Sequence, residues 1–102
     1  MTLPISTGAF DSMRKRAVLR SIYERDGKHC QHCGVRVRLL YKRRGTLPSD
    51  TATLDHIIPR GRGGGDETSN LLLACRRCNQ ERGCMEIGAF RELLARLGRV
   101  PA

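Results

Sequence analysis

Two pairs of cysteines give this sequence its clearest chemical signal. In each pair two residues separate the thiols: Cys30 from Cys33, and Cys75 from Cys78. A pair at this spacing can chelate one metal ion, and four thiolates make up the closed tetrahedral ligand set of a structural Zn²⁺ site. Cys84 has no partner at that spacing, so packing or an idle thiol is its expected role. The sequence therefore predicts one structural zinc ion held by the four paired cysteines.

The paired thiols have two other interpretations. In one interpretation they are ordinary core cysteines of a reduced protein, and in the other they are a pair of exchanging dithiols. The repeated spacing argues against both. His29 and His32 flank the first pair, and either could replace a thiolate, but four cysteines already suffice. We expect His32, which lies between two ligands in a tight turn, to face solvent or phosphate.

A second group of reactive side chains lies inside the zinc framework. Asp55 and His56 follow a β-branched stretch, and Asn79 directly follows the last paired cysteine. A carboxylate is a hard ligand that suits Mg²⁺ or Mn²⁺, and a neutral imidazole can take a proton from water near pH 7. Alone, each residue would be explained as a turn cap, a core histidine or a helix-surface amide. Their joint placement favours a catalytic set.

The elements that position these groups are predicted from hydrophobic periodicity and turn residues. A helix should begin at Asp11 or Ser12 and end at Gly27. Pro59 should stop a strand, and the glycine-rich residues 61–65 should form a loop. Strands are expected at 35–39, 51–58 and 71–73, and further helices at 76–83 and 85–97.

Length and charge narrow the class of protein. A chain of 102 residues supports one small domain, whose core is marginal unless a structural metal adds stability. We expect residues 1–10 to form a flexible arm and residues 11–102 to form a single domain.

Lysine and arginine number 19 against 10 aspartates and glutamates, for a net charge of +9. That charge favours a polyanionic partner such as nucleic acid, although it could also serve solubility alone.

The sequence also indicates where the protein works. No apolar run reaches the roughly 18 residues that span a bilayer, and the N-terminus lacks the pattern of a signal peptide. Paired cysteines without a secretion signal fit a reducing compartment, where metal binding is more common than disulfide formation. We therefore expect a soluble, cytoplasmic protein.

Three segments together resemble the HNH endonuclease family over residues 30–83. They are Cys-Gln-His-Cys at 30–33, Asp-His-Ile-Ile-Pro at 55–59 before the glycine-rich loop, and Asn-Leu-Leu-Leu-Ala-Cys-Arg-Arg-Cys-Asn at 70–79. The resemblance implies a small α+β domain of the ββα-metal, treble-clef-like kind. A four-cysteine zinc site would hold it together, and helices would flank it at both ends.

The resemblance also implies roles for individual residues. His56 would be the general base, Asn70 would orient its ring, and Asp55 and Asn79 would hold the catalytic metal ion. Asn79 stands where the family more often has a histidine, so this is the asparagine-ended form. An amide oxygen is a harder ligand than imidazole and favours Mg²⁺ or Mn²⁺. The implied reaction is hydrolysis of phosphodiester bonds in DNA.

Four arginines near these groups in sequence are candidates to bind phosphate, with solvated surface as the alternative for each. Arg76 and Asn79 are three residues apart and share a helix face, whereas Arg77 points elsewhere. The basic clusters at 14–16 and 42–44 would extend the same footprint without reading bases. The four candidates are Arg60, Arg62, Arg76 and Arg77.

Three functions are open at this point. The first is an enzyme that nicks or cuts DNA, as a monomer or a homodimer. The second is a non-catalytic zinc module that binds DNA or RNA through the same basic surface, and the third is an accessory subunit that a protein partner targets. Small family members of this kind often occur in phages and mobile elements, which is an association of the family.

Overall fold

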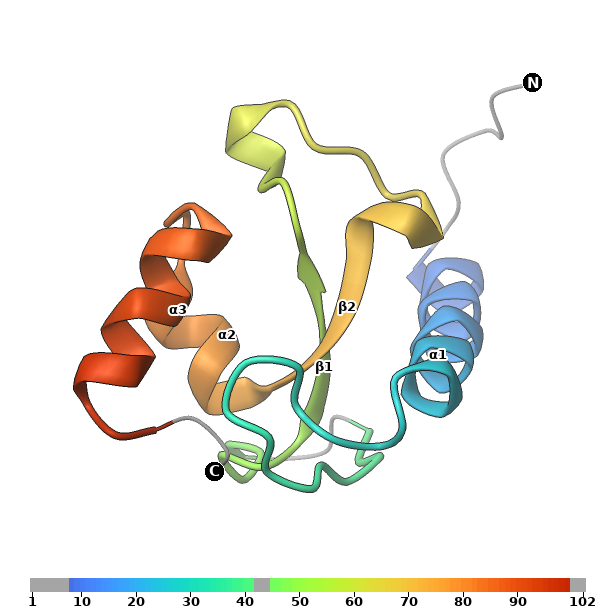
Figure 1. Ribbon diagram of the computed structural model, residues 1–102. Coiled ribbons are helices and arrows are strands. Elements are labelled where there is room, and N and C mark those ends of the chain that lie inside the picture. The colour runs from blue at the N-terminus through green and yellow to red at the C-terminus, as the bar shows by residue number, and fades with distance from the viewer. Residues whose placement is uncertain (1–7, 42–44, 100–102) are drawn as a thin grey trace.

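A two-stranded antiparallel sheet lies at the centre of the computed structural model, which describes residues 8–41 and 45–99 (Figure 1). Strand β1 (Ala52–His56) pairs with β2 (Leu71–Cys75) so that Ala52 lies opposite Cys75 and His56 opposite Leu71. All five residues of β2 are buried. The register places the second cysteine pair at one end of the sheet and His56 at the other.

Within the described residues, three α-helices flank this sheet on two sides. Helix α1 (Gly8–Arg25) lies on one side, and α2 (Arg76–Arg82) with α3 (Ile87–Arg96) lies on the other (Figure 1). The core is formed by Ile22 of α1, Val37, the residues of β2, and Phe90 and Leu94 of α3. The predicted α+β fold with helices at both ends is confirmed.

Helix α1 begins earlier than predicted, at Gly8, so Asp11 and Ser12 lie inside the helix and not at its start. It ends near the expected place, because Gly27 has a φ of +74° and turns the chain away. The Asp26 carboxylate then accepts a hydrogen bond from the Leu73 N–H at 2.9 Å, which ties this turn to β2. The flexible arm predicted for residues 1–10 falls mainly on residues 1–7, outside the described part of the chain.

The strand predicted at 35–39 does not form a ladder. The alternation itself is correct, since Val37 is fully buried between exposed Arg36 and Arg38. However, Val37 N–H bonds to Lys28 and Arg38 N–H bonds to Asp50, so neighbouring residues pair with two different segments. The segment therefore forms two isolated bridges, Arg36 with His29 and Arg38 with Thr51.

The second half of the chain follows the prediction closely. Helix α3 starts after Glu86, whose side chain accepts a hydrogen bond from the Ala89 N–H at 3.0 Å. Phe90 and Leu94 then share one face of α3 and are completely buried. In the part of the chain that the structure describes, no helix combines the length and apolar character that crossing a membrane requires.

Candidate zinc site and active site

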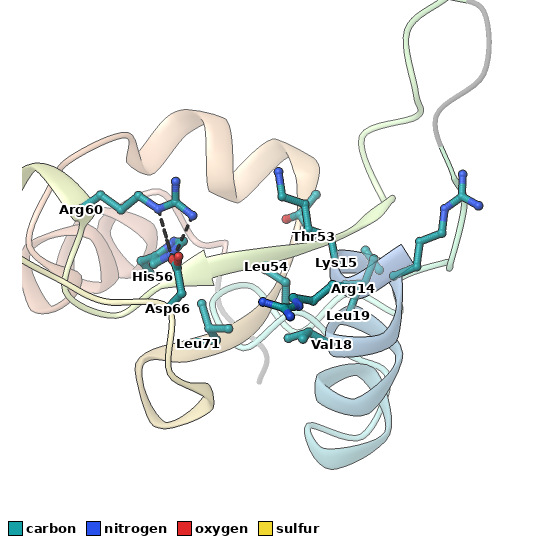
Figure 2. Close-up of a pocket in the computed structure, with 12 residues that line it drawn as sticks. Arg14, Lys15, Val18, Leu19, Thr53, Leu54, His56, Arg60, Asp66 and Leu71 are labelled. Atoms are coloured by element: carbon teal, nitrogen blue, oxygen red, sulfur yellow. Dashed lines mark hydrogen bonds and ion pairs between the residues drawn. The ribbon is translucent and has the colours of Figure 1, made fainter. Parts of the chain in front are cut away.

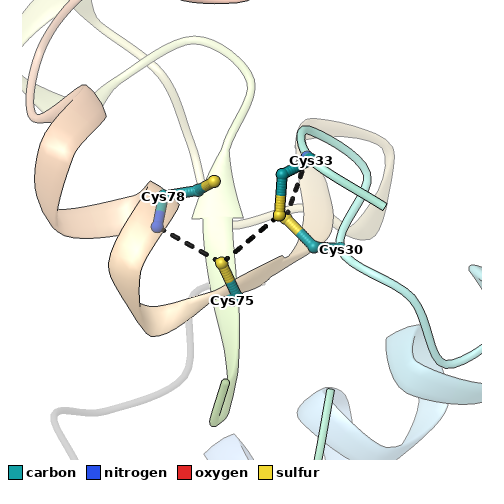
Figure 3. A group of neighbouring side chains, drawn as sticks. All are labelled: Cys30, Cys33, Cys75 and Cys78. Carbon is teal, nitrogen blue, oxygen red and sulfur yellow. Dashed lines mark hydrogen bonds between the residues drawn. The ribbon is translucent and has the colours of Figure 1, made fainter. Parts of the chain in front are cut away.

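The four paired cysteines converge on one point, as predicted. Their sulfur atoms all lie within 4.8 Å of one another (Figure 3), and the Sγ atoms of Cys33 and Cys75 are 3.8 Å apart. Tetrahedral zinc with Zn–S bonds of about 2.3 Å requires sulfurs separated by about 3.8 Å. Cys30 and Cys33 come from the turn after α1, and Cys75 and Cys78 come from the junction of β2 and α2. The cluster is therefore suited to zinc and ties both halves of the domain together.

Backbone donors around the cluster favour thiolate. The N–H groups of His32 and Cys33 lie 3.4 and 3.5 Å from the Cys30 sulfur, and the Cys78 N–H lies 3.3 Å from the Cys75 sulfur. Hydrogen bonds from the thiols of Cys75 and Cys78 lower the pKa of Cys30, and the Cys30 thiolate raises the pKa of Cys75 to about 12. Four thiolates this close repel one another, so joint ionisation requires a divalent cation.

Asp55 and His56 are the last two residues of strand β1. Asp55 is buried, and its Oδ2 atom accepts hydrogen bonds from His32 Nε2 at 2.7 Å and Arg82 Nη1 at 2.8 Å. The prediction that His32 faces solvent is therefore wrong. Its ring is fully buried and meets the ring of Phe90 edge-on, with centroids 5.2 Å apart. The turn between the first two cysteines points inward because Asp55 offers the ring a charged acceptor.

Arg82 is a buried residue of the candidate site that sequence reasoning missed. Its side chain is fully buried and donates from Nη1 to His56 O and from Nη2 to Ile57 O, both at 2.7 Å, in addition to the bond to Asp55. Nε donates to Met85 O at 2.9 Å. Arg82 follows Asn79 by three residues on α2, so the two share a helix face. This three-residue spacing from Asn79 is the sequence signal from which Arg82 could have been predicted as a site residue.

Asn79 lies across a small cavity from the end of β1. Its Nδ2 atom donates to Thr53 Oγ1 and to Leu54 O, each at 3.0 Å, which fixes the amide and leaves Oδ1 as the acceptor. Among the described residues no hydrogen bond to this Oδ1 occurs. Asp55, His56 and Asn79 all line the cavity, whose volume is about 230 Å³. The structure thus brings three of the predicted site residues together.

Asn70 has a different place from the predicted one. Its Oδ1 accepts from Ile58 N–H at 2.9 Å, and its Nδ2 donates to Ile58 O at 3.1 Å and to Gly65 O at 2.8 Å. Both amide hydrogens are used on carbonyl groups, so none is left for the His56 ring. The buried amide instead closes the loop that follows β1, because that loop turns back on itself and needs internal partners.

The ring of His56 is held by Asp66, a residue absent from the predicted set. His56 Nε2 lies 2.8 Å from Asp66 Oδ1, and Arg60 Nη2 donates to the same oxygen at 2.9 Å (Figure 2). The hydrogen bond from His56, supported by Arg60, lowers the pKa of Asp66, so this side chain is a carboxylate at neutral pH. Asp66 directly follows the glycine-rich residues 61–65, and only the fold brings it back to β1.

The four predicted arginines separate onto different surfaces. Arg60 lines the small cavity beside His56, and Arg62 donates from Nε to Cys84 O at 3.1 Å nearby. Arg77 lines a cavity next to Cys33 and Cys75, where it pairs with Glu81 at 3.5 Å. Arg76 is half-buried at the start of α2. Of the four, Arg60 is the one in contact with His56.

Strands β1 and β2 with helix α2 form a small ββα unit, and the four-cysteine cluster ties this unit to the turn after α1. The sequence profile of the HNH endonuclease family matches residues 30–83, more than half of the 102-residue chain. The chain therefore belongs to the HNH endonuclease family. No curated protein matches the sequence. Membership of this family, whose members are usually nucleases, indicates a nuclease-type function and implies binding to nucleic acid.

Proposed function

We propose that the protein is a metal-dependent endonuclease that hydrolyses phosphodiester bonds in DNA. The observation that carries this proposal is the shared cavity of Asp55, His56 and Asn79, which joins the end of β1 to the first half of α2. A carboxylate, an imidazole and a side-chain amide are the groups needed to hold one hard cation and to accept a proton beside it.

The hydrogen bonds of this site leave one oxygen of each proposed metal ligand for a cation. Asp55 uses Oδ2 on His32 and Arg82, and Asn79 uses its Nδ2 on Thr53 and Leu54. Asp55 Oδ1 and Asn79 Oδ1 would hold Mg²⁺ or Mn²⁺, which prefers such oxygen ligands and keeps several waters. When bound, the cation stabilises negative charge on the phosphate oxygens and on the leaving 3′ oxygen.

His56 is the proposed general base. Its Nε2 atom lies against the Asp66 carboxylate, which favours the tautomer with hydrogen on Nε2. Nδ1 then carries the lone pair and accepts a proton from the water that attacks phosphorus. Arg60, which contacts the same carboxylate, is placed to bind a phosphate oxygen of the substrate.

The role of His56 is tested by plasmid nicking. Purified protein is incubated with supercoiled DNA and Mg²⁺ or Mn²⁺, beside His56→Ala and a matched control, His29→Ala. His29 is exposed and bonds through Nδ1 to Gly27 O at 2.7 Å, so its loss leaves the cavity intact. Nicking should vanish in His56→Ala and persist in His29→Ala. Equal nicking by all three proteins would show that His56 is not the general base.

One observation favours a second candidate, a zinc module that binds nucleic acid without cutting it, alone or as an accessory subunit. Arg82 already supplies a cation to Asp55, and this charge repels a divalent ion. Under this alternative the wild-type protein binds DNA but nicks none at any Mg²⁺ or Mn²⁺ concentration. The same plasmid assay, combined with a binding measurement, separates the two.

A further inference from the structure

A second and larger cavity runs along the opposite side of β1 from the small one. It lies between α1 and the sheet and has a volume of about 530 Å³, within the range of pockets that hold a ligand of nucleotide size. His56 and Arg60 line both cavities. Figure 2 shows His56, Arg60 and Asp66 at one end of this groove, and Arg14 and Lys15 of α1 toward the Thr53 end.

The rim of the groove is cationic. Arg14, Lys15 and Arg16 contribute three positive charges from consecutive positions of α1, and Arg60 contributes a fourth. Among the described residues that line the groove, Asp66 is the acidic one, and it pairs with Arg60 and His56. The Arg16 guanidinium lies over the Tyr41 ring, 4.7 Å from its centroid, which directs that side chain. The groove therefore attracts a chain of negative charges.

The floor of the groove is apolar. Half-buried Val18 and Leu19 of α1 face Leu54 of β1 and Leu71 of β2 across it. A nucleic-acid strand offers the matching surface, since its phosphates are anionic and its sugars present apolar edges. A wholly apolar peptide would leave the cationic rim without partners.

We infer that this groove binds the strand that carries the bond to be cut and leads it to His56. Phosphates lie against Arg14, Lys15 and Arg16, and sugars lie against Leu54 and its apolar neighbours. The inference rests on the proposed function for the position of the cut. It also predicts that Arg77, which lies beside the zinc cysteines and pairs with Glu81, stands outside this path.

Matched charge-removal variants test the groove. One variant carries Arg14→Gln, Lys15→Gln and Arg16→Gln; the control carries Arg20→Gln, Arg91→Gln and Arg96→Gln, all exposed residues outside the groove lining. Glutamine preserves helix propensity, and both variants lose the same net charge. Affinity for a fluorescein-labelled 20-base-pair DNA duplex is measured by anisotropy over a salt series without added divalent metal. Melting temperatures confirm that both variants fold.

The groove variant should bind at least tenfold more weakly than the wild type, and the slope of log affinity against log salt should fall by about 2 to 3. The control should lose less than threefold. Equal losses in both variants, unchanged binding in the groove variant, or no binding by the wild type would overturn the inference. Should the groove variant fail to fold, Lys15→Gln alone, compared with Arg91→Gln alone, makes the same comparison.

A parallel nicking assay separates this inference from the proposed function. Selective loss of binding in the groove variant, with no nicking by the wild type, would support the groove and defeat the enzyme. Wild-type nicking that both variants retain, with equal affinities, would support the enzyme and defeat the groove.

Discussion

Oδ2 of Asp55 lies 2.8 Å from Nη1 of Arg82, and both side chains are almost completely buried. Because Arg82 also binds the carbonyl oxygens of His56, Ile57 and Met85, one guanidinium fixes the whole end of β1. The pair thus sets the direction in which Asp55 presents its other oxygen. Stability and the proposed metal site depend on the same contact.

Replacing Arg82 with methionine should cost about 3–5 kcal/mol of unfolding free energy, because a buried carboxylate is left without its cation. Urea unfolding of the zinc-loaded protein measures the loss. Arg96→Met on the exposed side of α3 is the control and should change stability by about 0.5 kcal/mol or less. The double variant with Asp55→Asn should lose less than the sum of the single changes. Strict additivity would mean that the pair is not coupled.

Loss of one zinc ligand should unfold the domain. Cys75→Ser removes a thiolate that joins β2 to the turn after α1, and metal binding and folding are coupled in sites of this kind. Circular dichroism and metal analysis should show loss of the cooperative melt and of bound zinc. Cys84→Ser, at an exposed thiol outside the cluster, should keep both. A Cys75→Ser protein with an unchanged melting temperature would contradict the structural assignment.

The loop after β1 should tolerate a methyl group at Gly61 but not at Gly64. A Cβ atom at Gly64 would collide with the Ile58 carbonyl oxygen and would lie 2.9 Å from Asn70 Nδ2, whereas the space at Gly61 is open. Because the obstacle is backbone, Gly64→Ala should cost about 1–3 kcal/mol and weaken the Asn70 contacts. Thermal melts of both alanine variants make the comparison. Equal melting temperatures would show that the loop is not held by Asn70 as described.

Asp66→Ala should reduce nicking by about 10- to 100-fold, since the carboxylate that fixes the ring of His56 is lost. Folding should be nearly unaffected, because exposed ion pairs contribute about 0–1 kcal/mol. The control is Asp50→Ala, which breaks a comparable pair with Arg38 away from both cavities that His56 lines. Initial nicking rates of the two variants and the wild type are compared at saturating Mg²⁺. A rate equal to that of the control would leave Asp66 without a positioning role.

Local patterns predicted the elements that carry their own signals. The thiol spacing predicted the cluster, and β-branched or apolar runs predicted β1 and β2. Hydrophobic periodicity predicted a helix at 85–97, where α3 is found. The segment with Val37 failed as a strand because its backbone partners, Lys28 and Asp50, belong to two distant turns. The alternation of apolar and charged residues indicates which side chains are buried. It does not indicate which groups the backbone N–H and C=O groups bind.

The contacts that organise the site could not be predicted from local sequence patterns. His32 of the first cysteine turn and Arg82 of α2 both bind Asp55, and Asp66, which follows the glycine-rich residues 61–65, binds His56. Each contact depends on how the zinc cluster and the sheet register bring separate segments together. The family resemblance implied that Asn70 orients the His56 ring. In the structure the Asn70 side-chain amide instead makes hydrogen bonds to the backbone of the loop after β1.

The central claim is that one hard cation binds between Asp55 and Asn79, next to His56. Crystals grown with zinc and soaked in Mn²⁺ test it by anomalous diffraction. The account predicts a manganese peak within about 2.0–2.5 Å of Asp55 Oδ1 and Asn79 Oδ1, separate from the zinc peak and lost in Asn79→Ala crystals. A fully occupied manganese ion elsewhere, or none at this position in a protein that nicks DNA with Mn²⁺, would contradict the account.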